Sequence, residues 1–186
     1  MSEVKKVSTP LTDEVIKGLK AGDMVALSGV IYTARDKAHK IMTDLLKEGK
    51  ELPADFRGQV IYYAGPTPEK PGQPIGSIGP TTSSRMDAFA PMMMDVAGLK
   101  GMLGKGPRDK GVVDAMLRNT CVYMVAIGGT GAAISKCVKS AQTIAYPELQ
   151  SEAVRRLEVE DLPCIVAIDC EGGNLFEQGI AQYRQE

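Results

Sequence analysis

The chain has 186 residues and a formal net charge of −1, from 22 Lys and Arg against 23 Asp and Glu. This length fits one domain, and the near-balanced charge argues against a nucleic-acid-binding protein, which usually carries a clear basic excess. Hydrophobic residues make up 44% of the sequence, enough for a sizeable core. No apolar run reaches the roughly 18–20 residues that would span a bilayer. We therefore expect a single domain over residues 1–186 that does not enter a membrane.

The cysteines and the N-terminal segment bear on the compartment. The N-terminus lacks the apolar core of a signal peptide, so a cytoplasmic location is the default expectation. The four cysteines, Cys121, Cys137, Cys164 and Cys170, lie in or beside apolar runs and show no CxxC spacing. In a reducing compartment this pattern predicts free thiols in the core, not disulfides or a zinc site. The sequence therefore offers no evident means of holding a metal within this chain.

Apolar, β-prone runs alternate with amphipathic segments along the chain. Residues 24–32 predict a buried strand. An apolar stripe over 38–46 predicts the clearest amphipathic helix, which ends at Gly49. Thr33 is placed to cap that helix, and Asp36, three residues later, would complete an acidic capping box.

Further along, residues 59–64 predict a second strand, and a helix from Ser84 to about Ala97 should be kinked or shortened at Pro91. The segment 99–107 predicts a glycine-punctuated turn. Strands alternating with helices indicate the α/β class, with the order of the sheet left open. The other predicted elements are a helix over 109–118, buried strands over 121–127 and 164–168, and a short helix near 132–138.

Three loops combine a flexible backbone with cationic or hydroxyl side chains. The first, 33–39 (TARDKAH), lies at a strand-to-helix junction, where free N–H groups and the helix dipole favour an anion. Arg35 adds a planar two-donor fork suited to a carboxylate. On these residues alone, the better-supported interpretation is structural, with Asp36 capping the helix and Arg35 in solvent. His39, the one histidine, is interpreted as a packing or supporting group and not as a ligand.

The second loop, 79–87 (GPTTSSRMD), places a cluster of hydroxyls just before a predicted helix. Such clusters often serve as helix caps. Arg85, however, would lie in the first turn of that helix, where a cation opposes the dipole unless an anion or a carboxylate answers it. Capping and ligand binding are evenly matched interpretations of this loop.

The third loop, 101–106 (GMLGKG), is similar to a P-loop but lacks both the first glycine and the Ser or Thr that would hold magnesium. The sequence GGTG at 128–131 also fails as a dinucleotide fingerprint, because Ile134 stands where a small residue is needed. What remains is Lys105, flanked by glycines and free to reach into a pocket. Two arginines, a lysine and several hydroxyls favour a small polyanion as ligand, and a single histidine makes a self-contained acid–base enzyme harder to build.

Taken in order, YTARDxAH, GPTTSxRMD and GMxGKG resemble the β subunit of class I (iron–sulfur) fumarate hydratases. The same region forms the C-terminal domain of the single-chain enzymes and the β subunit of L(+)-tartrate dehydratase. The resemblance covers about residues 8–175, and its motifs are specific only in combination. It implies the swivelling β/β/α fold in one domain and a hydro-lyase that reversibly adds water to fumarate, giving (S)-malate.

The resemblance also implies a partner and roles for individual residues. The family's [4Fe–4S] cluster is held by cysteines of an α subunit, so this chain would hold no metal and would act in a hetero-oligomer, or form a homodimer when isolated. Arg35, Arg85 and Lys105 would bind the carboxylates and hydroxyl of a small dicarboxylate, and Thr81 would be the base beside the reacting carbon. Asp36 would orient Arg35 or share in proton transfer, with helix capping as the alternative.

Three functions remain open at this point. The chain is half of a hydro-lyase acting on fumarate or, as the runner-up, on tartrate; a small-anion binding module without catalysis; or a structural subunit. The apolar segment 89–94 likewise has two interpretations. It is a helix buried on all sides, or Met92 and Met94 form a surface on which the α subunit docks.

Overall fold

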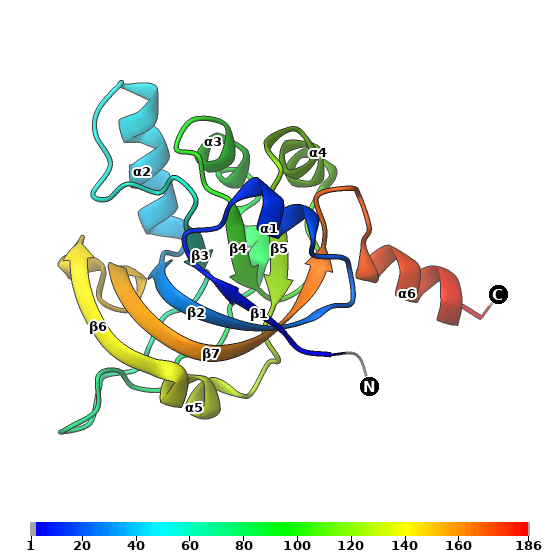
Figure 1. Cartoon of the computed structure of the whole chain (residues 1–186). Coiled ribbons are helices and arrows are strands. Elements are labelled where there is room, and N and C mark those ends of the chain that lie inside the picture. The colour runs from blue at the N-terminus through cyan, green and yellow to red at the C-terminus, as the bar shows by residue number, and fades with distance from the viewer. Residues whose placement is uncertain (1–2, 186) are drawn as a thin grey trace.

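The computed structural model describes residues 3–185, and its fold is built on one seven-stranded sheet that closes on itself (Figure 1). The first five strands run parallel in sequence order, and the long last strand returns antiparallel between the fifth and the sixth while also pairing with the second. This extra pairing completes a ring of β2, β3, β4, β5 and β7. The strands are β1 (Lys5–Ser8), β2 (Met24–Thr33), β3 (Val60–Tyr62), β4 (Gly101–Gly104), β5 (Val122–Val125), β6 (Val138–Ala145) and β7 (Val154–Ile168).

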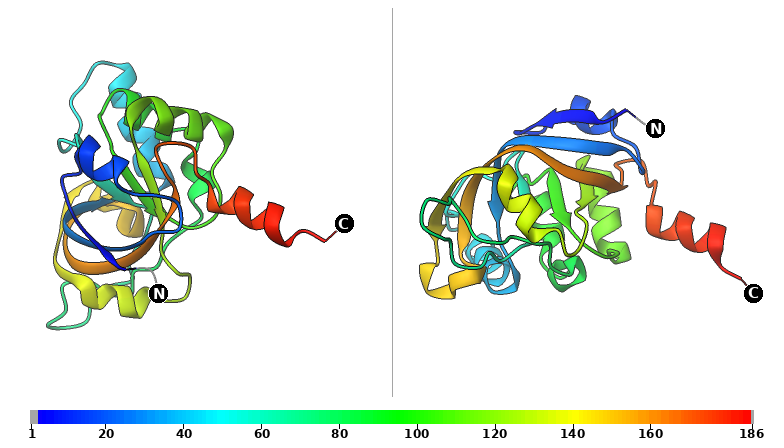
Figure 2. Two further views of the ribbon diagram at one scale, coloured as in Figure 1. Left: turned by 45° about the vertical axis from the view of Figure 1, so that its right-hand side comes forward. Right: turned by 90° about the horizontal axis from the view of Figure 1, so that it is seen from below.

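Helices cover one side of the short parallel strands, and the long strands β2, β7 and β6 curve past on the other (Figures 1 and 2). The covering helices are α2 (Asp36–Lys47), α3 (Ala90–Asp95) and α4 (Lys110–Asn119). The α/β class and the β/β/α arrangement expected from the sequence are confirmed. The remaining elements are α1 (Asp13–Lys17), α5 (Gly131–Ile134), the 3₁₀ segments η1 (Ser83–Met86), η2 (Ser135–Cys137) and η3 (Pro147–Glu152), and α6 (Leu175–Tyr183), which extends away from the body (Figure 1).

The pleat of the parallel strands divides the core in two. Val60 and Tyr62 of β3 belong to the cluster inside the ring, whereas Ile61 and Tyr63 belong to the cluster beneath the helices. All four are fully buried, because both faces of β3 are covered. A strand covered on both faces is a continuous apolar run in the sequence, which is why β3 and β5 could be predicted.

Most predicted elements are confirmed, and the turn predicted over 99–107 is wrong. That segment contains β4, whose residues are buried and registered between β3 and β5. Its glycines mark close packing and not a turn, since a Cβ at Gly101 would lie 2.7 Å from Val60 Cγ2. A Cβ at Gly104 would overlap Ser83 Oγ and lie 3.0 Å from Tyr63 Cδ2.

The helix predicted from Ser84 to about Ala97 is also wrong as one element. It is divided into η1 and α3, with the chain turning between them. Asp87 lies at this break, where its carboxylate accepts hydrogen bonds from the Arg108 side chain and from the Asp109 N–H. Pro91 lies in the first turn of α3, where the missing N–H is not needed, and does not kink a longer helix.

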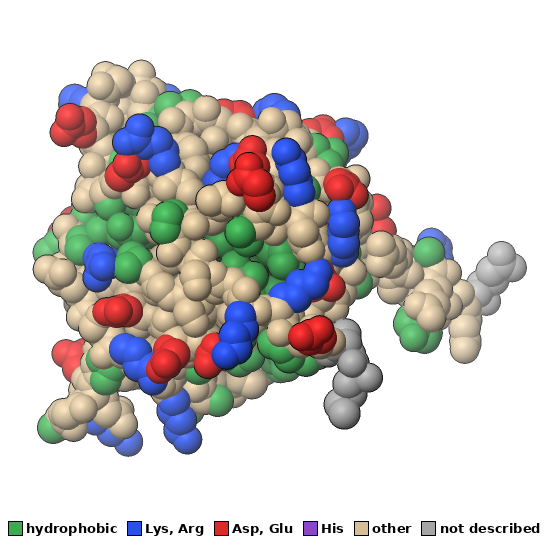
Figure 3. All heavy atoms as spheres, in the orientation of Figure 1, with side chains coloured by type: hydrophobic (Ala, Val, Ile, Leu, Met, Phe, Trp, Pro, Cys, Tyr) green, Lys and Arg blue, Asp and Glu red, His purple; other side chains and the backbone are tan. Residues whose placement is uncertain are grey.

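The sequence analysis missed β1, α1, β6 and α6, together with most of β7. Residues 164–168, predicted as a short strand, are the last part of the 15-residue β7. The earlier part of β7 alternates buried and exposed residues, so its apolar content is too diluted for a continuous run. On the face shown in Figure 3, basic and acidic side chains are interspersed. Within residues 3–185, no helix combines the length and the apolar character that crossing a membrane requires.

The segment 89–94 is largely buried. Met94 is 2% exposed and packs in the cluster beneath the helices, whereas Met92 is half-buried. The interpretation as a buried helix is confirmed for Ala90, Met93 and Met94. The alternative, a docking surface carried by Met92 and Met94, is wrong for Met94.

Replacing Met94 with alanine is therefore expected to lower the free energy of unfolding by about 2–5 kcal/mol, because the change leaves a cavity in a packed cluster. Val96→Ala, at the end of the same helix and 61% exposed, is the matched control and should change it by no more than about 0.5 kcal/mol. Denaturant titration followed by circular dichroism measures both. Small and equal effects would contradict the burial of Met94.

Candidate functional site

The candidate site lies at one edge of the sheet, where β2, β3 and β4 end side by side. Sheets of this kind bind ligands outside the carboxyl ends of their parallel strands. Arg35 and Asp36 follow β2 almost directly, and Lys105 follows β4 directly. Two of the three predicted loops are thus brought together by the strand order alone.

The segment 79–87 returns to the same edge. Thr81 N–H donates to the Tyr63 carbonyl at 2.7 Å, which fixes the segment to the end of β3. Thr82 then pairs with Lys105 in a short parallel bridge. All three predicted loops therefore meet, and Arg35, Asp36, Thr81, Arg85 and Lys105 extend from segments that are in contact.

Asp36 joins the two arginines. Arg85 Nε donates to Asp36 Oδ1 at 2.7 Å, and Arg35 Nε lies 3.9 Å from Asp36 Oδ2. Asp36 is thus the carboxylate that pairs with Arg85 of η1, as the sequence analysis required of a cation at that position. Its expected contact with Arg35 is the longer of the two. Because the Arg85 side chain is 48% exposed, the pair contributes at most about 1 kcal/mol to stability, and its main effect is to orient the guanidinium.

Part of this cluster has unused bonding capacity. Arg35 Nε and Asp36 Oδ2 are buried atoms with no hydrogen-bond partner among the described residues. Buried polar groups of this kind are normally paired, with protein, water or a ligand. The Arg35 Nε donor is therefore unsatisfied in this arrangement of the loops.

The capping box predicted for α2 is wrong. Thr33 is the last residue of β2, where it is registered opposite Tyr62 on one side and Arg155 on the other. Its hydroxyl accepts a hydrogen bond from Arg155 N–H at 3.3 Å and does not reach the helix. Arg35 occupies the capping position without a side-chain cap, so α2 begins later than the sequence indicated, at Asp36.

A residue that the sequence analysis missed provides the cap. Glu152, at the end of η3, accepts a hydrogen bond from Lys37 N–H at 3.1 Å, and its other oxygen lies 3.7 Å from Arg35 Nη2. No local signal could reveal this contact, because 115 residues separate Glu152 from Lys37. Because Asp36 and Glu152 carry two negative charges against the three positive charges of Arg35, Arg85 and Lys105, the site retains a net positive charge.

The backbone of Lys105 is held on both sides by the second loop. Its N–H is shared between Ser83 Oγ at 3.0 Å and the Thr81 carbonyl at 3.3 Å, and its carbonyl accepts from Ser83 N–H at 2.9 Å. The side chain of Lys105 is exposed and forms no ion pair among the described residues. A fixed backbone thus carries a free ammonium group.

Beneath the loops lies a buried ion pair that sequence reasoning also missed. Arg108 Nε donates to Asp87 Oδ1 at 2.6 Å, and the Arg108 side chain is 0% exposed. The guanidinium packs 5.3 Å from the Tyr63 ring centre and 5.0 Å from that of Tyr123. Because Asp87 ends the second loop and Arg108 follows the third, this pair ties the two loops together. A charge buried this deeply requires its partner.

His39 is fully buried under the first loop. Its Nδ1 donates to the Arg35 carbonyl at 3.0 Å, and its ring packs against Tyr63 at 5.4 Å between centres. Burial lowers the pKa of His39 from 6.5 to about 4, so the imidazole is neutral near pH 7. The interpretation of His39 as a packing group is confirmed.

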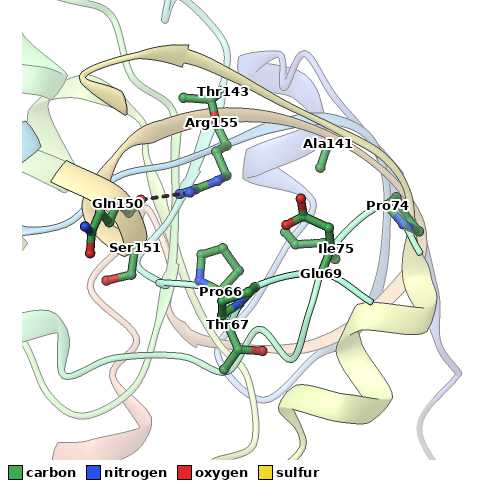
Figure 4. Close-up of a pocket in the computed structure, with 11 residues that line it drawn as sticks. Pro66, Thr67, Glu69, Pro74, Ile75, Ala141, Thr143, Gln150, Ser151 and Arg155 are labelled. Atoms are coloured by element: carbon green, nitrogen blue, oxygen red, sulfur yellow. Dashed lines mark hydrogen bonds between the residues drawn. The ribbon is translucent and has the colours of Figure 1, made fainter. Parts of the chain in front are cut away.

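A pocket of about 400 Å³ lies next to the site, between the 66–75 segment, β6, η3 and β7 (Figure 4). Arg155 lies along one side of the pocket and donates to the Gln150 carbonyl at 2.8 Å. None of the five predicted residues lines this pocket. Gly65 lies between the pocket residue Ser151 and Arg35, since a Cβ there would lie 2.8 Å from the Ser151 carbonyl oxygen and 3.0 Å from Arg35 Nη1.

The cysteines do not suit a metal cluster. All four are free, with Cys121 and Cys164 buried and the other two half-buried. Burial raises the pKa of the Cys121 and Cys164 thiols to about 12, which disfavours the thiolates that metal ligation requires. Among residues 3–185, no group of three or more His, Cys, Asp and Glu could hold a metal ion. The described residues of this chain therefore do not fit an iron–sulfur cluster.

Comparison with known proteins identifies the family. A family described as "Fumarase C-terminus" matches residues 2–179, which include all three loops. The chain belongs to the fumarase C-terminus family. It is 39% identical over 155 residues to "Fumarate hydratase class I, anaerobic" of Escherichia coli K12, and equally to "Fumarate hydratase 1, mitochondrial" of Leishmania major.

The extent of these matches differs among the relatives. For both fumarate hydratases the match covers 83% of this chain but 28% of the relative, so the chain spans little more than a quarter of their length. A protein of Methanocaldococcus jannaschii, provisionally named L(+)-tartrate dehydratase subunit beta, is 38% identical over 173 residues. That match covers 90% of this chain and 89% of the relative. This fumarase C-terminus chain therefore corresponds to a part of the longer relatives and to nearly all of the shorter one.

The burial of His39 predicts a pH-dependent stability. Between pH 6.5 and about 4 the unfolded chain protonates its imidazole while the folded chain does not, so the unfolded state binds more protons and the free energy of unfolding falls as pH falls. We expect a loss of up to about 3 kcal/mol across this window. Urea titrations at several pH values measure it, and His39→Gln, which removes the only histidine, should abolish most of the slope. An unchanged slope in that variant would contradict the assignment.

Proposed function

We propose that this chain is the β subunit of an iron–sulfur hydro-lyase that reversibly hydrates fumarate to (S)-malate together with a cluster-bearing α subunit. The observation that carries the proposal is the meeting of Arg35, Arg85 and Lys105 at one strand edge, in a chain of the fumarase C-terminus family. The match to fumarate hydratases supports the reaction, and the charges at the site support the class of substrate.

The cations suit a dicarboxylate. A carboxylate leaving water must regain charge-assisted hydrogen bonds, and the planar donors of Arg35 and Arg85 match its two oxygens. Lys105, a compact donor on a fixed backbone, suits the hydroxyl or a second carboxylate. Arg85 can exchange its half-exposed contact with Asp36 for a ligand oxygen at little cost, because exposed pairs are weak.

In the dehydration direction, a proton leaves the carbon beside a carboxylate and hydroxide leaves the neighbouring carbon, and hydration reverses both steps. Negative charge that builds up on the carboxylate would be stabilised by the preorganised arginines. We assign the proton transfer at carbon to Thr81, whose oxygen would act in its ionised form with Arg85 and Lys105 as stabilising cations. Asp36 orients Arg85 in this scheme and is the alternative proton carrier.

The open site supports a partner. Lys105 is exposed and Arg85 half-exposed, so a substrate bound here would remain in contact with water unless another surface covered it. The fumarate hydratase relatives are more than three times longer than the matched region, which supports an additional portion in that place. Since the residues of this chain do not fit the [4Fe–4S] cluster, the proposal assigns the cluster to that α portion.

A second candidate is the dehydration of L(+)-tartrate. It is favoured by the relative from Methanocaldococcus jannaschii, which matches this chain over nearly its whole length and is provisionally named as a tartrate dehydratase subunit. Malate and tartrate are both dicarboxylates that lose water, and they differ by one hydroxyl group. The same cations would serve either substrate.

The chain alone is expected to fold, to bind no iron and to show no hydratase activity. After co-expression with the α chain and anaerobic reconstitution, the complex should convert fumarate, malate or L(+)-tartrate, as measured by ultraviolet absorbance and product analysis. An isolated chain that has the brown colour of an iron–sulfur protein and is active would refute the proposal that the α subunit holds the cluster and is needed for activity. A reconstituted complex inactive on all these substrates would refute the enzyme, and calorimetry with fumarate would then test an anion-binding module.

Arg85→Ala should lower kcat/KM of the assembled enzyme. The decrease should correspond to a loss of roughly 3–5 kcal/mol of transition-state binding, because a charge-assisted contact to a desolvated carboxylate is lost. Arg85→Lys should restore only part of this, since the two-pronged geometry is gone. Arg57→Ala is the control, because Arg57 is 79% exposed and pairs with Asp55 outside the site. Near-normal kinetics of Arg85→Ala would return Arg85 to a surface role.

A further inference from the structure

We propose that Tyr123 is a positioning residue of the site, which sets Lys105 and the segment 81–85 at a fixed spacing through a closed chain of hydrogen bonds. This inference rests on the proposed function for its catalytic consequence, but its structural part can be tested without activity. Tyr123 lies on β5, next to β4, and none of the three loop motifs includes it.

The hydroxyl of Tyr123 contacts both loops. It lies 2.7 Å from the Gly106 carbonyl oxygen and 2.8 Å from Ser83 Oγ. A carbonyl can only accept, so the phenol donates its single proton to Gly106, and the Ser83 hydroxyl donates to the phenol oxygen. Ser83 Oγ in turn accepts from Lys105 N–H at 3.0 Å.

The resulting chain runs from Lys105 N–H through Ser83 and Tyr123 to the Gly106 carbonyl, and it closes on adjacent residues of the backbone. Each of the two hydroxyl protons in it has one assigned acceptor, and the Lys105 N–H is shared between Ser83 Oγ and the Thr81 carbonyl. Hydrogen bonds in such a chain polarise one another and strengthen together. The Lys105–Gly106 backbone is thereby fixed relative to Ser83, which lies two residues from both Thr81 and Arg85.

Burial makes this chain rigid. Tyr123 and Ser83 are both 0% exposed, so water does not replace a broken link without rearrangement. The Tyr123 ring also packs on the Arg108 guanidinium, whose partner Asp87 ends the second loop. The position of Tyr123 is therefore itself fixed by the buried ion pair beneath the loops.

Tyr63 provides a matched control within the same structure. Its ring packs on the same Arg108 guanidinium and is equally buried. Its hydroxyl, in contrast, makes no hydrogen bond to either loop. Removing the hydroxyl oxygen of either tyrosine leaves a similar cavity, but only Tyr123→Phe breaks the chain between the loops.

The first test uses hydrogen–deuterium exchange of the full chain, read at the amides of residues 81–85 and 104–106. Tyr123→Phe should speed exchange there by about ten-fold, because a buried donor and acceptor lose their partner. Tyr63→Phe should stay within about two-fold of the parent. Ser83→Ala breaks the same chain and should speed exchange by as much as Tyr123→Phe. The variant that carries both substitutions should exchange little faster than either single variant. Equal exchange in Tyr123→Phe and Tyr63→Phe would overturn the proposal, and if Tyr123→Phe does not fold, Ser83→Ala decides in the same way.

The second test uses the assembled enzyme. Tyr123→Phe should lower kcat/KM about ten-fold with a rise in KM, because Lys105 and Arg85 no longer meet the substrate at the right spacing. A merely structural loss would reduce the amount of active enzyme and leave KM unchanged, which would overturn the positioning role. If the parent complex is inactive on fumarate, malate and tartrate, the proposed function fails, while the exchange experiment still judges the hydrogen-bond chain.

Discussion

Strands β2 and β7 pair antiparallel along the whole of β2, from Met24 opposite Ile165 to Thr33 opposite Arg155, and this pairing turns an open sheet into a ring. It also places η3, which precedes β7, against the start of α2. Glu152 reaches Arg35 and Lys37 for that reason. The electrostatics of the site therefore depend on a strand pairing whose residues carry none of the proposed chemistry.

Charge in this region is arranged on two levels. Arg108 and Asp87 form a fully buried pair that holds loops together, and its disruption would leave an unpaired charge in the core. Arg35 and Arg85 lie above it, partly exposed, with carboxylates at longer or weaker contacts. The buried Arg108–Asp87 pair suits a structural role, because neither side chain can exchange the other for a new partner. The upper level suits binding because its cations can exchange a protein carboxylate for one from a ligand.

The sequence predicted what depends on local pattern. The helix at 36–47 could be found from the periodicity of its apolar residues, and the buried strands from their continuous apolar runs. The three loops are weak signals one by one, and only their order made the resemblance specific. The glycines of β4 led to the wrong prediction of a turn, because glycine occurs both in turns and where backbones pack closely. Only the neighbours of Gly101 in the fold distinguish these two cases.

The residues that support the site could not be predicted in this way. Glu152, Arg108 and Tyr123 act on loops that are distant along the chain, and each is an ordinary member of its own segment. From the sequence, a tyrosine in an apolar strand is predicted to belong to the core whether or not its hydroxyl forms a hydrogen bond. Their importance follows from the register of strands and from the closure of the ring, which no local window contains.

Gly104 determines how closely the second loop can approach the end of β4. Because it has no side chain, Ser83 can lie directly on the end of β4, where a methyl group would overlap its hydroxyl. The spacing between the end of β4 and the second loop therefore depends on the absence of a side chain at Gly104. Any change to that spacing would begin at this strand position, with the charged residues left as they are.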